Sequence, residues 1–225
     1  MWSVAYRLTH LAVRVIGERR TFAVLAGLAR LFHRLAYESA VRLYGEAYPG
    51  VVTALDPQAL VEIATGADSV LDIGCGIGKY CRLLAPHVGR VVGIDHDREA
   101  LELARRRTPF DNVEYRLGDV RDVVGGPFDV ALLVHVLEHI SDPVGFLESL
   151  HEVAHRVAVE VPDFESDPVN VPRLAIGLPF ASDADHVREY TERTLLDTLA
   201  TSGWEVESIR KRGGVIAAVA VSPSP

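Results

Sequence analysis

The chain has 225 residues, of which 48% are hydrophobic and 24% are charged, and its net charge is −8. This size and composition are typical of one globular domain with at most a small appendage. The acidic excess argues against non-specific nucleic-acid binding, so we expect no nucleic-acid partner. The two cysteines, Cys75 and Cys81, lie too close together to form a disulfide framework, which favours a reducing, cytoplasmic location.

The first 50 residues form a basic segment that is expected to be helical. Apolar residues recur at helical spacing in two runs, which are Leu8, Leu11, Ala12, Val15 and Ile16, and then Leu25, Leu28, Leu31, Phe32 and Leu35. From Met1 to Ala36 six arginines and one glutamate give a net charge of +5, so the remainder carries −13. Gly17 and Gly27 are expected weak points, and Pro49-Gly50 is expected to end the segment.

Three interpretations of this segment stay open. The favoured one is an N-terminal helical cap, residues 1–50, packed on a main domain of residues 51–225. A basic amphipathic surface in peripheral contact with a membrane is the second, and a mobile lid is the third. Arginines interrupt the apolar runs well short of the ~20 residues that span a bilayer, and no signal-peptide order of charge, apolar stretch and cleavage site is visible.

The main domain alternates short apolar strands with helices. Five runs predict strands, namely SVLDIG, RVVGID, NVEYRLGD, FDVALLVH and RVAVEVPD. Helical stretches separate them, namely KYCRLLAPHV, REALELARRR, a short VRDVV and DPVGFLESLHEVA. This alternation predicts βαβ units and a parallel sheet. A further helix and two strands, Trp204–Arg210 and Val215–Val221, close the chain, and Gly213-Gly214 between them predicts a hairpin.

A glycine loop, VLDIGCGIGKY, lies where the first strand leads into the first helix. It is not a Walker loop, because Lys79 is followed by Tyr80 and the position five before Gly78 is Ile73. It is also a poor dinucleotide loop, because Lys79 stands where the third glycine belongs. Glycines at a strand-to-helix turn still allow a ligand to approach backbone N–H groups closely.

Three acids stand at the ends of successive predicted strands. Asp72 immediately precedes the glycine loop, where its carboxylate would repel a pyrophosphate and suit a cationic or zwitterionic ligand. Asp95 ends the second strand about 20 residues later, a position from which an acid accepts both ribose hydroxyls. Asp119 follows the third strand. Together they indicate a nucleoside site without phosphates.

Four segments resemble the class I S-adenosylmethionine-dependent methyltransferases, in the broad group that includes the ubiquinone-biosynthesis methyltransferases. The segments are VLDIGCGIG, VVGIDHD, LGDV and FDVALLVHVLEHISDP. The resemblance implies an α/β fold, a Rossmann-like seven-stranded and mostly parallel sheet with an antiparallel C-terminal hairpin strand. It also implies S-adenosylmethionine as cofactor and S-adenosylhomocysteine as product.

The resemblance assigns parts of the cofactor to residues. Asp72 and the glycines would cradle its amino-acid part, and Asp95 would hold the ribose. His96 would lie along the adenine, and Asp119 would accept from its amine. The full implied set is Asp72, Gly74, Cys75, Gly76, Gly78, Asp95, His96, Asp119, Val120 and His135.

His135, Glu138 and His139 spell H-x-x-E-H, the signature of inverted zinc metalloproteases. A protease would need these ligands on one face of a helix, whereas FDVALLVHV is apolar, β-branched and typical of a strand. His135 would then stand at the strand end facing cofactor and acceptor. Some members of the resembled group hold a divalent metal here with two acids and a histidine. Because His135 replaces the first acid, we expect no magnesium site and assign no metal ligand, and a softer metal stays an open alternative.

The long insertion at about 162–190 is expected to build the acceptor pocket. In similar methyltransferases a histidine and an aromatic residue at this place sit over the acceptor, so His186 and Tyr190 join His135 and His139 as catalytic candidates. Several histidines favour a hydroxyl acceptor, whose proton must be removed. We therefore expect an O-methyltransferase acting on a small molecule such as a sugar, polyketide, quinol or other secondary metabolite, as a monomer or homodimer.

Two alternatives stay open at this point. One is a lipid-linked or macromolecular acceptor, approached through the basic N-terminal helices. The other is a cofactor-binding homologue that no longer transfers methyl groups and serves as a scaffold or in a rearrangement reaction.

Overall fold

The structure is a computed structural model that describes residues 2–44, 57–120, 126–167, 169–176 and 186–223. The chain divides into two compact units. The helical unit comprises residues 1–51 and 167–180, and the sheet unit comprises residues 52–166 and 181–225. Part of the insertion that was expected to build the acceptor pocket therefore groups with the N-terminal helices.

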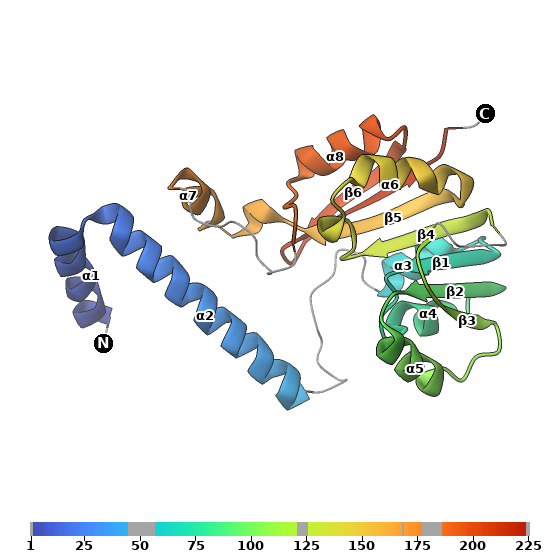
Figure 1. The fold of residues 1–225 in the computed structure, drawn as a ribbon, viewed down its shortest axis with the longest axis horizontal. Helices are drawn as coiled ribbons and strands as arrows, with labels where there is room; N and C mark the ends of the chain where they lie inside the picture. The colour runs from blue at the N-terminus through green and yellow to red at the C-terminus, as the bar shows by residue number, and fades with distance from the viewer. Residues whose placement is uncertain (1, 45–56, 121–125, 168, 177–185, 224–225) are drawn as a thin grey trace. The chain divides into compact units, whose positions relative to one another are not determined.

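The helical unit contains α1 (Trp2–Ile16), α2 (Glu18–Tyr44) and the short α7 (Asn170–Ala175) (Figure 1). Gly17 separates α1 from α2 with a φ of +83°, a left-handed conformation that glycine adopts without steric cost. The expected weak point at Gly17 is thus confirmed, whereas α2 runs through Gly27 without a break. The guanidinium of Arg19 donates to the Ile176 carbonyl at 2.6 Å and ties α2 to the segment after α7.

The sheet unit is built on seven strands in the order β3-β2-β1-β4-β5-β7-β6. The strands are β1 (Ser69–Ile73), β2 (Arg90–Asp95), β3 (Val113–Leu117), β4 (Phe128–Val134), β5 (Ala154–Pro162), β6 (Glu205–Arg212) and β7 (Val215–Val221). The first five pair in parallel, and β7 runs antiparallel to both β5 and β6. The predicted sheet and its C-terminal hairpin are confirmed.

Helices cover both faces of this sheet (Figure 1), with α6 and α8 on one face and α4 and α5 on the other. The helices of the sheet unit are α3 (Pro57–Ala64), α4 (Lys79–Leu84), α5 (Arg98–Arg107), α6 (Pro143–Ser149) and α8 (Glu192–Thr201). The described residues also form the 3₁₀ turns η3 (Leu137–His139), η4 (Leu150–Glu152) and η5 (Phe164–Ser166). The short helix expected at VRDVV and the Pro49-Gly50 stop lie outside the described residues, apart from Val120.

Two apolar cores, one on each face, hold the layers together. In β4 the side chains alternate, so that Ala131 and Leu133 belong to the core under α6 and α8. Val130 and Leu132 belong to the core under α3, α4 and α5. A strand buried on both faces in this way contains a continuous apolar run, which in β4 is VALLV, residues 130–134.

Trp204 fastens the start of β6 to α6. Its side chain is 2% exposed, and its indole N–H donates to the Leu147 carbonyl at 2.9 Å. The ring stacks on His151, with the ring centroids 4.3 Å apart.

Replacing Trp204 with Phe keeps an aromatic ring but removes the indole N–H, so that the Leu147 carbonyl loses this donor and keeps the N–H of Leu150. We expect Trp204→Phe to lower the free energy of unfolding by about 0.5–1.5 kcal/mol, measured by urea denaturation. A change below about 0.5 kcal/mol would contradict this role for the hydrogen bond.

Candidate functional site

A cavity of about 710 Å³ opens at the carboxyl ends of β1 to β4. The strand order reverses on either side of β1, and ligands of open α/β sheets bind in the crevice at such a switch point. Seven residues expected from the sequence line it, namely Gly74, Asp95, His96, Asp119, Val120, His135 and His139. Apolar side chains complete its wall, namely Ile73, Ile94, Val136, Ile140 and Phe146. Its volume is in the usual range for a small-molecule site.

Asp95 connects two of the loops that border this cavity. One carboxylate oxygen accepts the N–H of Gly76 in the glycine loop at 2.7 Å, and the other accepts the N–H of Asp97 at 2.8 Å. The carboxylate is 9% exposed and lies on the cavity wall. Each oxygen keeps a further lone pair, so a pair of ribose hydroxyls would complete its hydrogen bonding.

The glycine loop is shaped by close contacts that exclude a side chain. A Cβ on Gly74 would lie 2.7 Å from the Val136 side chain, and one on Gly78 would collide with the ring of Tyr115. Both glycines have a positive φ, as does Gly76. The N–H groups of Gly74 and Cys75 donate to the Ile94 carbonyl at 2.9 and 3.1 Å. Gly74 itself lines the cavity, and Cys75 is buried beneath it.

Asp72 lies below the loop and does not line the cavity. It is 2% exposed, and the Cys81 thiol donates to its carboxylate at 3.1 Å. Burial, together with repulsion from Asp95, raises the pKa of Asp72 to about 7, although the Cys81 hydrogen bond opposes the shift. An ammonium group close to this carboxylate would relieve the cost of its charge. At the rim, by contrast, the His96 side chain is 97% exposed.

His135 begins the loop after β4 and stands between two buried carboxylates. Its Nδ1 lies 3.1 Å from Glu138 and its Nε2 lies 3.5 Å from Glu160. Both glutamates are at most 1% exposed. The backbone of His135 is in the left-handed region with a φ of 56°, a conformation that costs a non-glycine residue free energy and is concentrated at functional sites.

These two carboxylates decide the charge of His135. Burial disfavours the imidazolium, but hydrogen bonding and attraction to Glu138 and Glu160 outweigh it and raise the pKa of His135 to about 9. At neutral pH His135 is therefore cationic, and one positive charge lies between two negative ones. A protonated imidazole has no lone pair with which to remove a proton.

Glu160 is a site residue that sequence reasoning missed. It lies inside β5 between Val159 and Val161 and is fully buried. The available signal was a charged residue within the apolar run of residues 157–161, because glutamate is almost never buried without a partner. The partner, His135, became visible only once β4 and β5 were aligned in the sheet.

A second cluster joins Glu138 to His139 and His186. One ligand atom from each of these residues lies within 4.8 Å of the others, and the two imidazole rings make an edge contact with centroids 4.9 Å apart. The Glu138 carbonyl accepts the N–H groups of Val187 and Arg188, which holds the second histidine against the loop. Oε1 of the Glu138 carboxylate is the oxygen that pairs with His135. Oε2 is buried without a hydrogen-bond partner among the described residues.

This second cluster fits a small divalent cation. Two imidazoles and one carboxylate form a donor set that suits zinc and its neighbours better than magnesium. The set differs from H-x-x-E-H, because His186 takes the place of His135. The segment also lacks the helix that a protease needs, since β4 ends at Val134 and only the 3₁₀ turn η3 follows.

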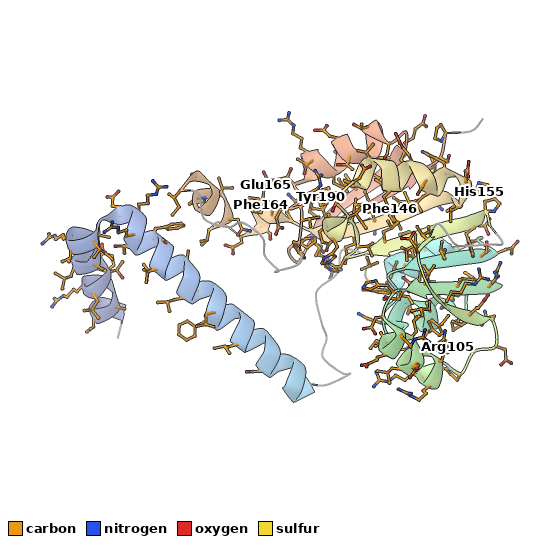
Figure 2. The ribbon with its side chains drawn as sticks, in the orientation of Figure 1. Arg105, Phe146, His155, Phe164, Glu165 and Tyr190 are labelled. Atoms are coloured by element: carbon orange, nitrogen blue, oxygen red, sulfur yellow. The ribbon has the colours of Figure 1, made fainter. Side chains whose placement is uncertain are left out.

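Tyr190 lies in the core rather than on the cavity wall. Its side chain is 1% exposed and belongs to the core under α6 and α8. Its carbonyl accepts the N–H of Phe164 at 2.9 Å, and Figure 2 shows the two residues beside each other. Burial raises the pKa of Tyr190 to about 12. This environment is that of a packing residue.

Comparison with known proteins identifies the class of this domain. A family profile described as "Methyltransferase domain" matches residues 19–209, so the chain belongs to that family. It is a class I S-adenosylmethionine-dependent methyltransferase domain, and S-adenosylmethionine is its cofactor.

Two curated relatives match most of the chain. A Streptomyces fradiae protein named "Uncharacterized 37.1 kDa protein in transposon TN4556" is 32% identical over 71% of this chain and 54% of its own length. A Mycolicibacterium smegmatis protein named "Probable S-adenosylmethionine-dependent methyltransferase" is 30% identical over 67% of this chain and 56% of its own. The chain thus spans about half the length of these relatives.

Solved structures show the same fold at low identity. A SAM-dependent methyltransferase from Aquifex aeolicus superposes with a TM-score of 0.60 at 22% identity, covering 75% of this chain and 90% of that one. The [4+2]-cyclase SpnF superposes with a TM-score of 0.59 at 16% identity, covering 75% of this chain and 82% of that one. Because a methyltransferase and a cyclase share this fold, the fold alone does not define the reaction.

Asp95→Ala is expected to weaken the binding of S-adenosylhomocysteine roughly tenfold to a hundredfold, because it removes the proposed ribose acceptor and the acceptor of the Gly76 N–H. Calorimetric titration measures the change. Glu102→Ala is the matched control, since Glu102 is an exposed acid on α5. If the two variants bind S-adenosylhomocysteine with equal affinity, Asp95 does not contribute to cofactor binding.

The His135 imidazole is expected to titrate near pH 9, which NMR of its ring carbons and nitrogens measures directly. Since the folded pKa is raised, the stability that this charge contributes is complete below the ordinary value near 6.5 and is lost as the pH rises toward 9. Glu160→Gln should lower the midpoint of the His135 titration, because it removes one of the two carboxylates that favour the imidazolium. A midpoint near 6.5 in the unchanged protein would contradict the proposed ion pairs.

Proposed function

We propose that the protein transfers the methyl group of S-adenosylmethionine to a hydroxyl oxygen of a small molecule. The observation that supports this most is the position of His139. It lines the same cavity as the proposed ribose acceptor Asp95, and its ring is in contact with His186. A base and the cofactor residues thus border one space of suitable volume.

The reaction is an in-line displacement. When bound, S-adenosylmethionine would supply an activated methyl group: the acceptor oxygen would take it as the S–CH₃ bond breaks, and S-adenosylhomocysteine would be the leaving group. The hydroxyl proton passes to the imidazole of His139, which releases it to water afterwards. Because the sulfonium is already activated, the protein's main tasks are to align the two reactants and to exclude water.

His135 has a different task in this scheme. Its cationic ring is held by Glu138 and Glu160, which fixes the loop that carries His139. The sequence made His135 one of four catalytic candidates, but its raised pKa favours a positioning role at neutral pH. His186 orients His139, and Tyr190 supports the packing behind them.

The cavity wall favours an acceptor with an apolar body. Val136, Ile140 and Phe146 line the cavity together with His135 and His139, and Phe146 projects from α6 (Figure 2). Apolar walls with a few polar groups are typical of sites for small organic molecules. Among the expected acceptors, a quinol or polyketide hydroxyl therefore suits this site better than a sugar.

We expect His139→Ala to lower turnover by about 10²-fold while S-adenosylhomocysteine affinity stays unchanged. The assay follows radiolabelled methyl transfer to a panel of phenols, quinols and polyketides. His155→Ala is the matched control, because this exposed histidine lies at the other end of β5 (Figure 2). Undiminished transfer by His139→Ala would exclude this base.

A chelator separates this scheme from a metal-assisted one. A divalent ion held by Glu138, His139 and His186 would lower the pKa of a bound hydroxyl. The scheme with His139 as base predicts that dialysis against EDTA leaves turnover unchanged. Loss of turnover that zinc or manganese restores, together with metal uptake that His186→Ala abolishes, would replace the base by a metal centre.

A further inference from the structure

The helical unit carries a row of apolar side chains along the outside of α1. Four residues at positions i, i+4, i+7 and i+11 lie on one face of a helix, namely Val4, Leu8, Leu11 and Val15. They are between 57% and 73% exposed. Such exposure of contiguous large apolar side chains marks an interaction surface.

α2 repeats the same spacing. Its row is between 44% and 55% exposed and consists of Val24, Leu28, Leu31 and Leu35. Phe32, which is 64% exposed, widens this face. In the described part of the sheet unit the large apolar side chains that are exposed are scattered, namely Ile77, Leu117 and Val187. The two rows are therefore a property of the helical unit.

Arginines accompany the apolar rows. On α1, Arg7 and Arg14 are exposed, and both neighbour Leu11 at helical spacing. Together with Tyr6 and His10 they line a hollow of about 480 Å³. Two guanidinium groups next to a leucine offer the chemistry that a phosphate headgroup above an acyl chain requires.

The charge of the segment selects an anionic partner. Residues 1–36 carry +5, in a chain whose net charge is −8. Two copies of the segment packed on each other would bring these positive charges together, which disfavours self-association through this face. No described helix is both long and apolar enough to cross a membrane, so contact with a bilayer would be in the plane of its surface.

We propose that α1 and α2 bind the surface of an anionic phospholipid bilayer. Their apolar rows enter the boundary between headgroups and acyl chains, and the arginines pair with lipid phosphates. A lipid surface accommodates rows of valine and leucine without a complementary pocket. Binding through this surface would bring the sheet unit to acceptors that are dissolved in the bilayer. The binding of the helices to the bilayer does not depend on the proposed methyl transfer.

The test is co-sedimentation of the full chain, without cofactor, with vesicles of phosphatidylcholine alone or mixed with phosphatidylglycerol. We expect binding to the anionic vesicles that weakens at high salt. Arg7→Gln and Arg14→Gln should each weaken it about fivefold. Leu8→Asp should weaken it more than tenfold, because it removes a buried leucine and adds a repelled charge.

Leu117→Asp is the matched control, since Leu117 is a comparably exposed leucine of the sheet unit, 44% exposed. It should bind vesicles as the unchanged chain does, and circular dichroism checks that each variant is folded. Equal binding to neutral and anionic vesicles, or full binding by folded Leu8→Asp, would overturn the proposal. The proposal would also be overturned if the unchanged chain does not bind vesicles and forms a dimer that Leu8→Asp dissociates. The apolar rows would then be an interface between copies of the chain.

Discussion

The carboxylate of Asp95 joins two loops that border the cavity proposed to hold the cofactor. It accepts one N–H from the glycine loop after β1 and one from the turn after β2. Hydrogen bonds to a charged acceptor are among the stronger ones in proteins, and these two fix the relative position of Gly76 and Asp97. The buried Asp72 below the loop and the shape of the cavity wall above it both depend on this arrangement.

A second network organises the opposite side of the same cavity. The imidazolium of His135 offsets the burial of Glu138 and Glu160, two charges that would be too costly without it. The rigid turn that results presents His139 to the cavity and holds the segment of His186 through the Glu138 carbonyl. The proposed cofactor side and the proposed acceptor side of the cavity are thus each organised by buried carboxylates.

Much of the fold and several residues of the cavity were predictable from the local sequence pattern. The alternation of apolar strands with helices defined the sheet, and the strand-end positions of Asp95, Asp119 and His135 placed them at one edge. Pattern does not reveal which side chains lie across neighbouring strands, so the pairing of His135 with Glu160 and the resulting charge were not predictable. Tyr190 was expected over the acceptor but lies in the core, because adjacency in the chain to His186 does not determine which way a side chain points.

The central claim is that the cavity at the carboxyl ends of β1 to β4 holds the cofactor. Calorimetric titration of the chelator-treated chain with S-adenosylmethionine and S-adenosylhomocysteine tests it most directly. The account predicts that one molecule binds per chain with a dissociation constant in the micromolar range, about −8 kcal/mol. A folded protein that binds neither compound would contradict it.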